Sequence, residues 1–525
     1  MSAAPVALDA ALGLGLAGGY VAQMARWLRV LQREHYEPTS MRRFLGRWSS
    51  PQVFSATSVE RKKLTRPITL SHVLVVALFV TVLARADLLA ALVAVLYGLL
   101  CPRGLSLRGR TAKLEWTRRL RTIAIVATLF VVVLAAVGFL SERPWLVPVG
   151  VVWVVPLILA LTTRLLGPYE SRRAQSFVTL AAARLHRVHP RVVAITGSYG
   201  KTSTKNYLAD LLSPDGGVVA TPRSFNNRAG LSRAINENLA DDTRVFIAEM
   251  GTYGPGEIRE LCEWCPPQIA VVTAIGPVHL ERMKTLDVIE QAKFEITESA
   301  STVVVNIDDD RLGRWVDRLV ASGKRVRTAG SVRLDASVRV VVEENAWAVV
   351  LDNERIATME PLLGVQPTNV ACAVASALEL GVSIDDVVSR LSRVTPVTNR
   401  STVAVAPSGV VVVDDTFNAN PASAAAALKL LSSLQLSGRR VVVTPGLIEL
   451  GRDQYGENLS LAKKVAAAGD ELVVVARTNV IALATGYEQP PRRFDTREEA
   501  VQWVRSALVT GDGVLYLNDL PDHYP

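Results

Sequence analysis

The apolar residues of this chain are concentrated before Arg164, in stretches long enough to cross a lipid bilayer. Val6 to Met24 carries a single charge, and it lacks the basic leader and cleavage site of a signal peptide, so it is expected to be retained as a span. Leu70 to Cys101 carries charge only near its middle, at Arg85 and Asp87. One long helix would bury both charges at the bilayer centre, which is costly, so two short helices joined by a turn are expected.

Two further apolar segments, Thr122 to Leu140 and Trp145 to Thr163, complete a set of five expected membrane spans. The segments Arg26 to Arg66 and Arg103 to Arg121 are rich in Lys and Arg, whereas each opposite turn holds a single Arg. The positive-inside rule places both basic loops, and everything after the last span, in the cytoplasm. We interpret residues 1–165 as a multi-pass domain of the inner cell membrane. The alternative is that these helices belong to a large soluble core.

The net charge of +9 is unevenly distributed along the chain. Residues 1–165 hold 20 Lys and Arg against 7 Asp and Glu, so the remaining residues have a net charge of −4. Because the basicity belongs to the expected membrane loops, and the rest has no basic or aromatic recognition motif, no nucleic-acid partner is expected. Cys262 and Cys265 have a C-x-x-C spacing, but a zinc site would need two more ligands nearby, so the pair is not expected to bind zinc.

A phosphate-binding loop is expected directly after a buried strand, Val192 to Ile195. The strand leads into a segment with the short spacing G-x-x-G-K-T, Thr196-Gly197-Ser198-Tyr199-Gly200-Lys201-Thr202-Ser203-Thr204. Glycines let backbone N–H groups approach phosphates, and the following helix points its positive end at them. Lys201 would reach the β- and γ-phosphates, and the Thr202 hydroxyl would join a magnesium ion. The expected cofactors are ATP and Mg²⁺, and the expected nucleotide-binding residues here are Gly197, Ser198, Gly200, Lys201, Thr202 and Ser203.

Four more sequence blocks follow the loop, Thr221-Pro222-Arg223-Ser224-Phe225-Asn226-Asn227, Ile247-Ala248-Glu249-Met250-Gly251, Val272-Thr273-Ala274-Ile275-Gly276-Pro277-Val278-His279-Leu280-Glu281 and Ala292-Lys293-Phe294-Glu295-Ile296. In this order they resemble the central domain of the Mur ligases, the ATP-dependent enzymes that build the peptidoglycan stem peptide. The likeness is greatest to the branch that adds D-alanyl-D-alanine. It implies an α-helical membrane domain at 1–165, a P-loop α/β central domain at 166–396 and a Rossmann-like C-terminal domain at 397–525.

The catalytic set expected from these blocks is Lys201, Glu249, His279 and Lys293. Glu249 ends an apolar strand, so its carboxylate would emerge at the edge where open α/β sheets bind ligands, and a hard oxygen suits magnesium. The resemblance makes His279 a second magnesium ligand and Lys293 a carbamylated, anionic ligand. The residue pattern by itself would make His279 structural and Lys293 a surface lysine. The expected metal ligands are Thr202, Glu249, His279 and Lys293.

The carboxyl third contains further matches to the family. Asn369 is the one asparagine retained from an adenine-framing H-N-x-x-N motif, and Arg400 stands where the family has a phosphate-contacting arginine. The segment after Val413, Asp414-Asp415-Thr416-Phe417-Asn418-Ala419-Asn420-Pro421, resembles the family's D-D-S-Y-N-A-N-P block, which implies that Asp415 binds the ribose. The resemblance assigns the substrate to the asparagines Asn226, Asn227, Asn418 and Asn420.

The expected activity is that of a membrane-bound amide ligase. It would activate a carboxylate as an acyl phosphate and join it to a small-molecule amine, an amino acid or a dipeptide, in cell-wall synthesis. The membrane unit replaces the domain with which Mur ligases grip UDP, so the carboxylate acceptor is expected to be lipid- or nucleotide-linked, with membrane lipids as further partners. The alternatives are a polymer-forming ligase like the poly-γ-glutamate synthetases and a non-catalytic membrane scaffold with the same fold.

Overall fold

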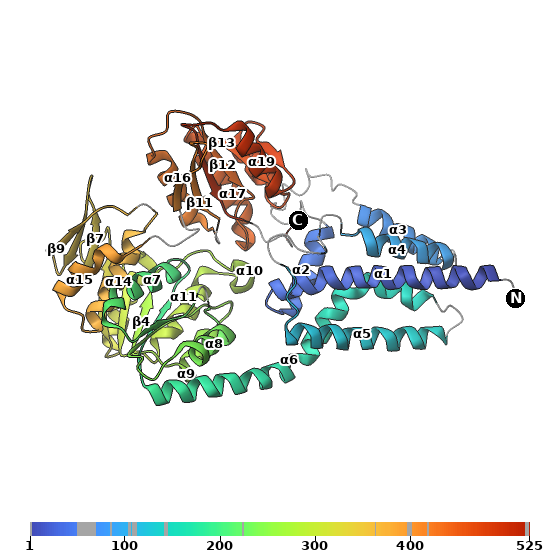
Figure 1. Cartoon of the computed structure of the whole chain (residues 1–525), viewed down its shortest axis with the longest axis horizontal. Helices are drawn as coiled ribbons and strands as arrows, with labels where there is room; N and C mark the ends of the chain where they lie inside the picture. Colours follow the sequence, from blue (N-terminus) through green and yellow to red (C-terminus); the bar gives the residue numbers. More distant parts are fainter. Residues whose placement is uncertain are drawn as a thin grey trace.

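The computed structural model describes residues 3–49, 70–83, 87–102, 105, 107, 113–140, 145–222, 225–362, 364–395, 402–416, 419–519 and 524. They form a helical N-terminal unit and two α/β domains (Figure 1). The N-terminal unit lies at one end of an elongated molecule, and a long helix, α6, runs from it to the central domain. The C-terminal domain lies above the central domain in this view, with α10 and α17 on the facing sides.

The N-terminal unit consists of α1 (Ala3–Arg33), α2 (Pro38–Ser49), α3 (Leu70–Leu83), α4 (Asp87–Leu100), α5 (Arg118–Phe139) and α6 (Leu146–Val188). The two short helices expected between residues 70 and 101 are confirmed as α3 and α4, although the connecting residues 84–86 lie outside the described residues. α1 packs against α4 and α6, and α5 packs against α6.

The basic segment expected between Arg26 and Arg66 is helical in much of its first half. α1 continues to Arg33, and α2 follows after a short corner. Arg26 is buried, and its guanidinium donates hydrogen bonds to the carbonyls of Gly98 and Leu99 in the last turn of α4 and to that of Leu105 beyond the helix. The carbonyls of Gly98 and Leu99 have no partner within their helix, so a basic side chain there satisfies a need that the sequence pattern does not reveal.

Two of these helices, Arg118–Gly138 of α5 and the 43-residue α6, are long and apolar enough to cross a membrane. Shorter apolar helices span Val73–Val82 and Leu88–Leu100. The expected domain boundary at residue 165 falls inside α6, which is continuous to Val188, so the bundle and the central domain share one helix.

The central domain is built on a nine-stranded sheet with the order β2-β3-β1-β4-β5-β6-β7-β8-β9. Its strands are β1 (Arg191–Thr196), β2 (Val218–Ala220), β3 (Val245–Glu249), β4 (Ile269–Val272), β5 (Thr302–Asn306), β6 (Arg325–Gly330), β7 (Val338–Val342), β8 (Trp347–Leu351) and β9 (Glu354–Met359). Pairing is parallel from β2 to β7 and antiparallel from β7 to β9. The alternating residues expected between Val326 and Val350 therefore extend the central sheet.

Helices cover both faces of this sheet. They are α7 (Lys201–Leu212), α8 (Arg228–Asn238), α9 (Glu257–Trp264), α10 (Leu280–Met283), α11 (Leu286–Phe294), α12 (Asp310–Gly313), α13 (Val316–Ala321), α14 (Pro367–Glu379) and α15 (Ile384–Arg390). Successive strand residues point to opposite faces, so Val193 packs under α7 and α14, whereas Val192 packs with α8 and α9.

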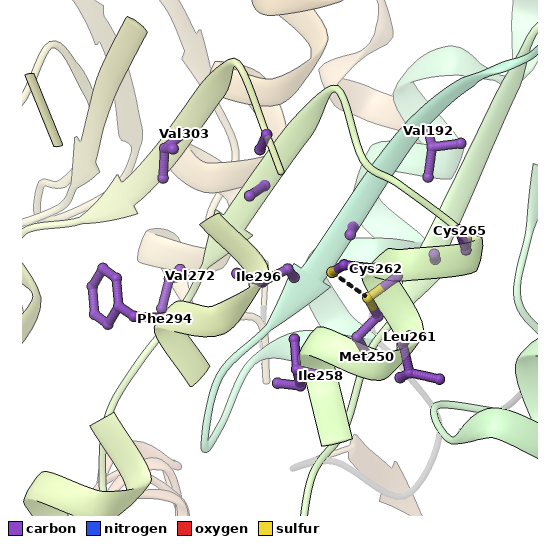
Figure 2. Packing of buried hydrophobic residues seen from close by; sticks show 14 of the residues in the cluster. Val192, Met250, Ile258, Leu261, Cys262, Cys265, Val272, Phe294, Ile296 and Val303 are labelled. Atoms are coloured by element: carbon purple, nitrogen blue, oxygen red, sulfur yellow. Dashed lines mark hydrogen bonds between the residues drawn. The ribbon is translucent and has the colours of Figure 1, made fainter. Parts of the chain in front are cut away.

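The core on the α9 face supports the strands that lead into the candidate site (Figure 2). Cys262 on α9 donates a hydrogen bond from Sγ to the Sδ of Met250, at 3.8 Å, and Cys265 lies fully buried nearby. Burial raises the pKa of the Cys262 thiol to about 12, and it also raises the pKa of Cys265. Both thiols are therefore apolar core groups in this structure.

The C-terminal domain has a six-stranded sheet with the order β10-β11-β15-β12-β13-β14, parallel except for β10. Its strands are β10 (Thr402–Val405), β11 (Val411–Asp415), β12 (Arg440–Thr444), β13 (Glu471–Val475), β14 (Arg492–Phe494) and β15 (Gly513–Leu517). Its helices are α16 (Pro421–Ser433), α17 (Gln454–Ala467), α18 (Val480–Tyr487) and α19 (Arg497–Ala507). Short 3₁₀ turns occur at Ser213–Asp215, Glu295–Thr297, Leu391–Arg393 and Gly451–Asp453.

Candidate active site

The phosphate loop connects β1 to the N-terminus of α7, as the glycine spacing predicts. Gly200 is the N-cap of α7 and has φ of +80°, a conformation that favours glycine. A Cβ at Gly200 would collide with Oδ1 of Asn369, which places Asn369 on α14 against the loop. Lys201 donates a hydrogen bond from Nζ to the carbonyl of Gly197 at 2.7 Å, so its side chain curls over the loop.

Glu249 lies at the end of β3, beside the phosphate loop, because β3 pairs with β1 in parallel. Its carboxylate accepts hydrogen bonds from the Thr202 hydroxyl at 2.9 Å and from Nδ2 of Asn226 at 3.1 Å. The Nζ of Lys205 lies 3.4 Å from the same carboxylate, and both side chains are almost fully buried. Lys205 also donates to the carbonyl of Thr221 at 2.8 Å. Glu249 is thus held by groups from α7 and from the loop before α8.

Lys293 is only 2% exposed, in contrast to the surface lysine that its sequence pattern indicates. It lies near the end of α11 and lines the same cavity as the phosphate loop. Burial, assisted by the charge of Lys201, lowers the pKa of Lys293 well below its usual value. A buried amine with a lowered pKa is nucleophilic, which is the property that carbamate formation requires.

His279 connects the central and C-terminal domains. Its Nδ1 lies 2.5 Å from Oε2 of Glu449. Burial by itself would raise the pKa of Glu449, but the hydrogen bond and charge of His279, with Arg282 and Arg43, lower it to about 2. In the tautomer that donates from Nδ1, the ring keeps Nε2 available for a ligand. The ring of Tyr253 packs edge-on against His279, with centroids 4.6 Å apart, and burial raises the pKa of Tyr253 to about 12.

These residues share one cavity of about 740 Å³, which we call the central pocket. The central domain lines it with Lys201, Thr202, Asn226, Glu249, His279 and Lys293, among others. The C-terminal domain contributes Asp414, Thr416, Asn420, Glu449, Arg497 and Asn518. The N-terminal unit contributes Arg33 and His35. The pocket therefore combines a phosphate loop with side chains from all three parts of the chain.

Not every residue expected from the sequence lies in the pocket lining. Ser198, Gly200 and Asn227 line it too, and Asn227 also caps α8 by accepting from Gly230 N at 2.9 Å. Asp415 is buried, whereas its neighbours Asp414 and Thr416 line the pocket. Three expected residues stand outside the lining: Gly197 and Asn369 at the loop, and buried Ser203 on α7. Asn420 lines the pocket and also caps α16. Arg400 and Asn418 lie outside the described residues.

Sequence reasoning missed several groups that the fold brings to the pocket or to the carboxylate of Glu249. Lys205 carried a weak signal, because it lies one helical turn after Lys201 and faces the same side of α7. Glu449 lies in a Glu-Leu-Gly sequence, Glu449 to Gly451, to which the residue pattern assigned no role. No sequence pattern indicated a role for Tyr253 or His35, because only the tertiary structure brings them together. Oη of Tyr253 lies 3.2 Å from Nε2 of His35.

The donor chemistry at Glu249 fits a magnesium ion. Within the described ranges, no three His, Cys, Asp or Glu side chains lie close enough together to form a metal site by themselves. The Thr202 hydroxyl and the Glu249 carboxylate are nevertheless adjacent hard oxygens at the start of a phosphate-binding helix, which is the setting that magnesium uses with nucleotide phosphates. A carbamate on Lys293, which lines the same pocket, would add further oxygen ligands.

Comparison with known families agrees with this geometry. Residues 195–377 match the model of the Mur ligase middle domain, and residues 399–517 match the model of the Mur ligase glutamate ligase domain. The relatives include the UDP-N-acetylmuramoyl-tripeptide–D-alanyl-D-alanine ligases of Mycobacterium tuberculosis and Bacillus subtilis. The first is 34% identical over 57% of this chain and 61% of its own length. The second is 29% identical over 52% of this chain and 59% of its own length. The chain thus spans about three fifths of these curated relatives.

Solved structures share the fold as well. The MurF ligase of Thermotoga maritima in complex with ADP superposes with a TM-score of 0.55 at 25% identity, covering 66% of this chain and 80% of that one. A MurF structure from Acinetobacter baumannii superposes with a TM-score of 0.57 at 24% identity, covering 66% of this chain and 77% of that one. The matched family domains begin after α6, so the helices before it lie outside them.

Proposed function

Because this chain belongs to the Mur ligase family, we propose that it is a membrane-bound, ATP-dependent amide ligase of peptidoglycan synthesis. The observation that carries the proposal is the central pocket, which unites a phosphate loop with Glu249, His279 and Lys293 and with residues of the C-terminal domain. ATP is the expected phosphoryl donor, and the Thermotoga maritima relative was solved with ADP.

The reaction begins with transfer of the γ-phosphoryl group of ATP to the acceptor carboxylate, which gives an acyl phosphate and ADP. The amine then attacks the carbonyl carbon, and the tetrahedral intermediate expels phosphate to leave the amide. Two anions must meet in the first step, so cationic groups are needed around them. Lys201 lies over the phosphate loop and supplies one such charge. Thr202, Glu249, His279 and Lys293 would hold magnesium, which neutralises phosphate charge when it is bound.

Glu449 and Asn518 line the side of the pocket over which we propose that the C-terminal domain closes. Both residues come from the C-terminal domain, and both have positive φ, at +63° each. Strained backbone of this kind persists where surrounding contacts hold it, and it is frequent at ligand sites. Closure of the C-terminal domain over the phosphate loop would exclude water from the acyl phosphate and so prevent its hydrolysis.

The membrane part of the proposal is supported by the surface of the N-terminal unit. Large apolar side chains are exposed along α3, α4, α5 and α6, such as Phe79 at 64%, Val133 at 60% and Leu165 at 70%. Soluble monomers rarely expose apolar surface of this extent, and a lipid environment would cover it. We therefore place the unit in the inner membrane, with the α/β domains and the pocket in the cytoplasm and a lipid- or nucleotide-linked acceptor.

The amine is proposed to be D-alanyl-D-alanine or another short D-peptide, by analogy with the relatives' names. The decisive test uses the full chain purified in detergent, with ATP, D-alanyl-D-alanine and either UDP-N-acetylmuramoyl-tripeptide or its lipid-linked counterpart. We expect ADP release and a single new amide by mass spectrometry. Lys201→Ala should abolish both, whereas Lys429→Ala, an exposed lysine on α16, should retain both. Full turnover by Lys201→Ala would refute the assignment.

The same preparation tests the location. The full chain should stay in the membrane fraction after alkaline extraction, and recovery in the soluble fraction would contradict the membrane proposal. A ladder of glutamate additions in place of a single amide would favour a polymer-forming ligase. No ADP release with any of these substrates would favour the scaffold.

A further inference from the structure

The corner between α1 and α2 is a built feature of the N-terminal unit. At the end of α1, the Tyr36 N–H donates to the carbonyl of Leu31 at 2.8 Å, and the His35 N–H donates to that of Gln32 at 3.3 Å. These two bonds form a Schellman motif with His35 at the left-handed position, where φ is +55°. Glycine is the usual residue there, so this corner keeps a histidine at a position that disfavours it.

The histidine points away from the bundle toward the central domain. Its Nε2 lies 3.2 Å from the hydroxyl of Tyr253, and the two rings lie 5.3 Å apart. The Tyr253 ring is in turn fixed by the edge of His279, at 4.6 Å, and by the guanidinium of Arg282, at 4.7 Å from its centroid. The N-terminal unit thus reaches a side chain that touches a member of the expected catalytic set.

Partly buried ion pairs hold the corner in this place. Glu34 is 5% exposed and forms ion pairs with Arg43 on α2 and, at 3.5 Å, with Arg282 on α10. Arg43 also lies 3.5 Å from Glu281 on α10. Two acidic and two basic side chains therefore alternate between the corner and α10, so the charges compensate one another at low exposure.

We propose that this corner is the acceptor-binding element of the active site, in which His35 and Tyr253 position a carboxylate-bearing, anionic acceptor beside the phosphate loop. The proposal rests on the function proposed above. The corner lies outside the residues matched by the two family domains, yet it supplies Arg33 and His35 to the lining of the central pocket. A cation and an imidazole from this unit, in a pocket that Lys201 of the central domain also lines, suit an anion.

The pair is suited to hydrogen bonding with an acceptor oxygen. A tyrosine hydroxyl can accept one hydrogen bond and donate another. In the tautomer with a proton on Nε2, His35 donates to the Tyr253 oxygen, and the phenolic O–H is then free to donate toward the pocket. His35 acts through Tyr253, so it is a positioning residue, and its loss should weaken acceptor binding while leaving the nucleotide site intact.

The test compares three single variants, and the double variant His35→Gly with Tyr253→Phe, of the full chain in detergent. His35→Gly removes the imidazole but suits the left-handed backbone, so the corner should fold. Tyr253→Phe removes only the hydroxyl. Arg187→Ala, on the exposed side of α6, is the matched control. Each variant is assayed for ADP binding by calorimetry and for the KM of UDP-N-acetylmuramoyl-tripeptide and of the lipid-linked muramoyl-tripeptide.

We expect His35→Gly and Tyr253→Phe each to raise the acceptor KM about tenfold or more, as loss of a hydrogen bond to a charged group does, with ADP affinity unchanged. The acceptor KM of the double variant should not exceed that of the more strongly affected single variant, because the two side chains act as a unit. A lower wild-type KM for UDP-N-acetylmuramoyl-tripeptide identifies the acceptor as nucleotide-linked, and a lower KM for the lipid-linked muramoyl-tripeptide identifies it as lipid-linked.

Unchanged acceptor KM in both variants, with wild-type turnover intact, would overturn the acceptor site and leave the proposed function standing. A parallel loss of ADP affinity would also overturn it, because the corner would then be a general structural support. Absence of turnover by the wild-type chain in both arms would instead refute the proposed function, and the acceptor site with it.

Discussion

Lys205 is the buried residue whose removal should disturb this protein most clearly. Its Nζ lies 3.4 Å from Oε2 of Glu249, and the two side chains are 2% and 1% exposed. Two unit charges this close attract each other by about 5 kcal/mol at an effective dielectric constant of about 20. Lys205→Met keeps the length of the side chain but leaves the Glu249 carboxylate buried without its cation.

Breaking a buried pair in this way costs about 3–5 kcal/mol. For a domain of this size, about 1 kcal/mol corresponds to about 2–4 °C in Tm, so the transition of the α/β domains should fall by about 6–20 °C. The assay is thermal unfolding of the ligand-free full chain in detergent, followed by tryptophan fluorescence, with the exposed Lys463→Met as control.

The double variant Lys205→Met with Glu249→Gln decides the cause. It removes both charges, so it should be more stable than Lys205→Met, with a coupling energy above about 1 kcal/mol. A Tm for Lys205→Met equal to the wild-type value, or a double variant equal to the sum of the two single effects, would refute the electrostatic reasoning.

Two further predictions concern the phosphate loop and an ion pair far from it. Gly200→Ala should weaken ADP binding about tenfold or more, because the new Cβ meets Asn369 and φ is positive; Gly216→Ala, also at positive φ but in open space, should bind ADP normally. The bidentate hydrogen bond from Arg390 lowers the pKa of Asp215 in the folded protein. The ionised carboxylate therefore stabilises the fold at pH values above its unfolded pKa of about 3.8. This stabilisation is lost as the pH falls through the lower pKa of the folded state. In Asp215→Asn, the part of the decrease in Tm at acid pH that is due to Asp215 should disappear from a profile measured down to pH 3. A profile equal to that of the wild type would contradict this prediction.

Local features of the chain were predicted well. The glycine spacing after Val192 to Ile195 specifies a strand, a turn and a helix within a few residues, and the structure places them as predicted. The charges at Arg85 and Asp87 divided one apolar stretch into α3 and α4 for a reason that involves only neighbouring residues. Glu249 likewise follows from the end of its own strand.

Features that depend on distant residues were not predictable in the same way. Lys293 lies on a helix whose sequence pattern indicates an exposed lysine, and its burial beside the central pocket arises from tertiary packing. The extension of α1 through Arg26 required knowledge that the end of α4 lies beside it and offers free carbonyls. Neither partner is near in the sequence, so neither periodicity nor charge pattern carries the information.

The sequence by itself determined the two α/β domains, the phosphate loop and the carboxylate at the end of β3, because hydrophobic periodicity, glycine geometry and strand ends are local properties. Only the tertiary structure decided which cation neutralises that carboxylate and which side chains of the N-terminal unit line the central pocket. His35 and Tyr253 are separated by 218 residues. Their meeting results from the packing of the helical unit against α10, which no local pattern encodes.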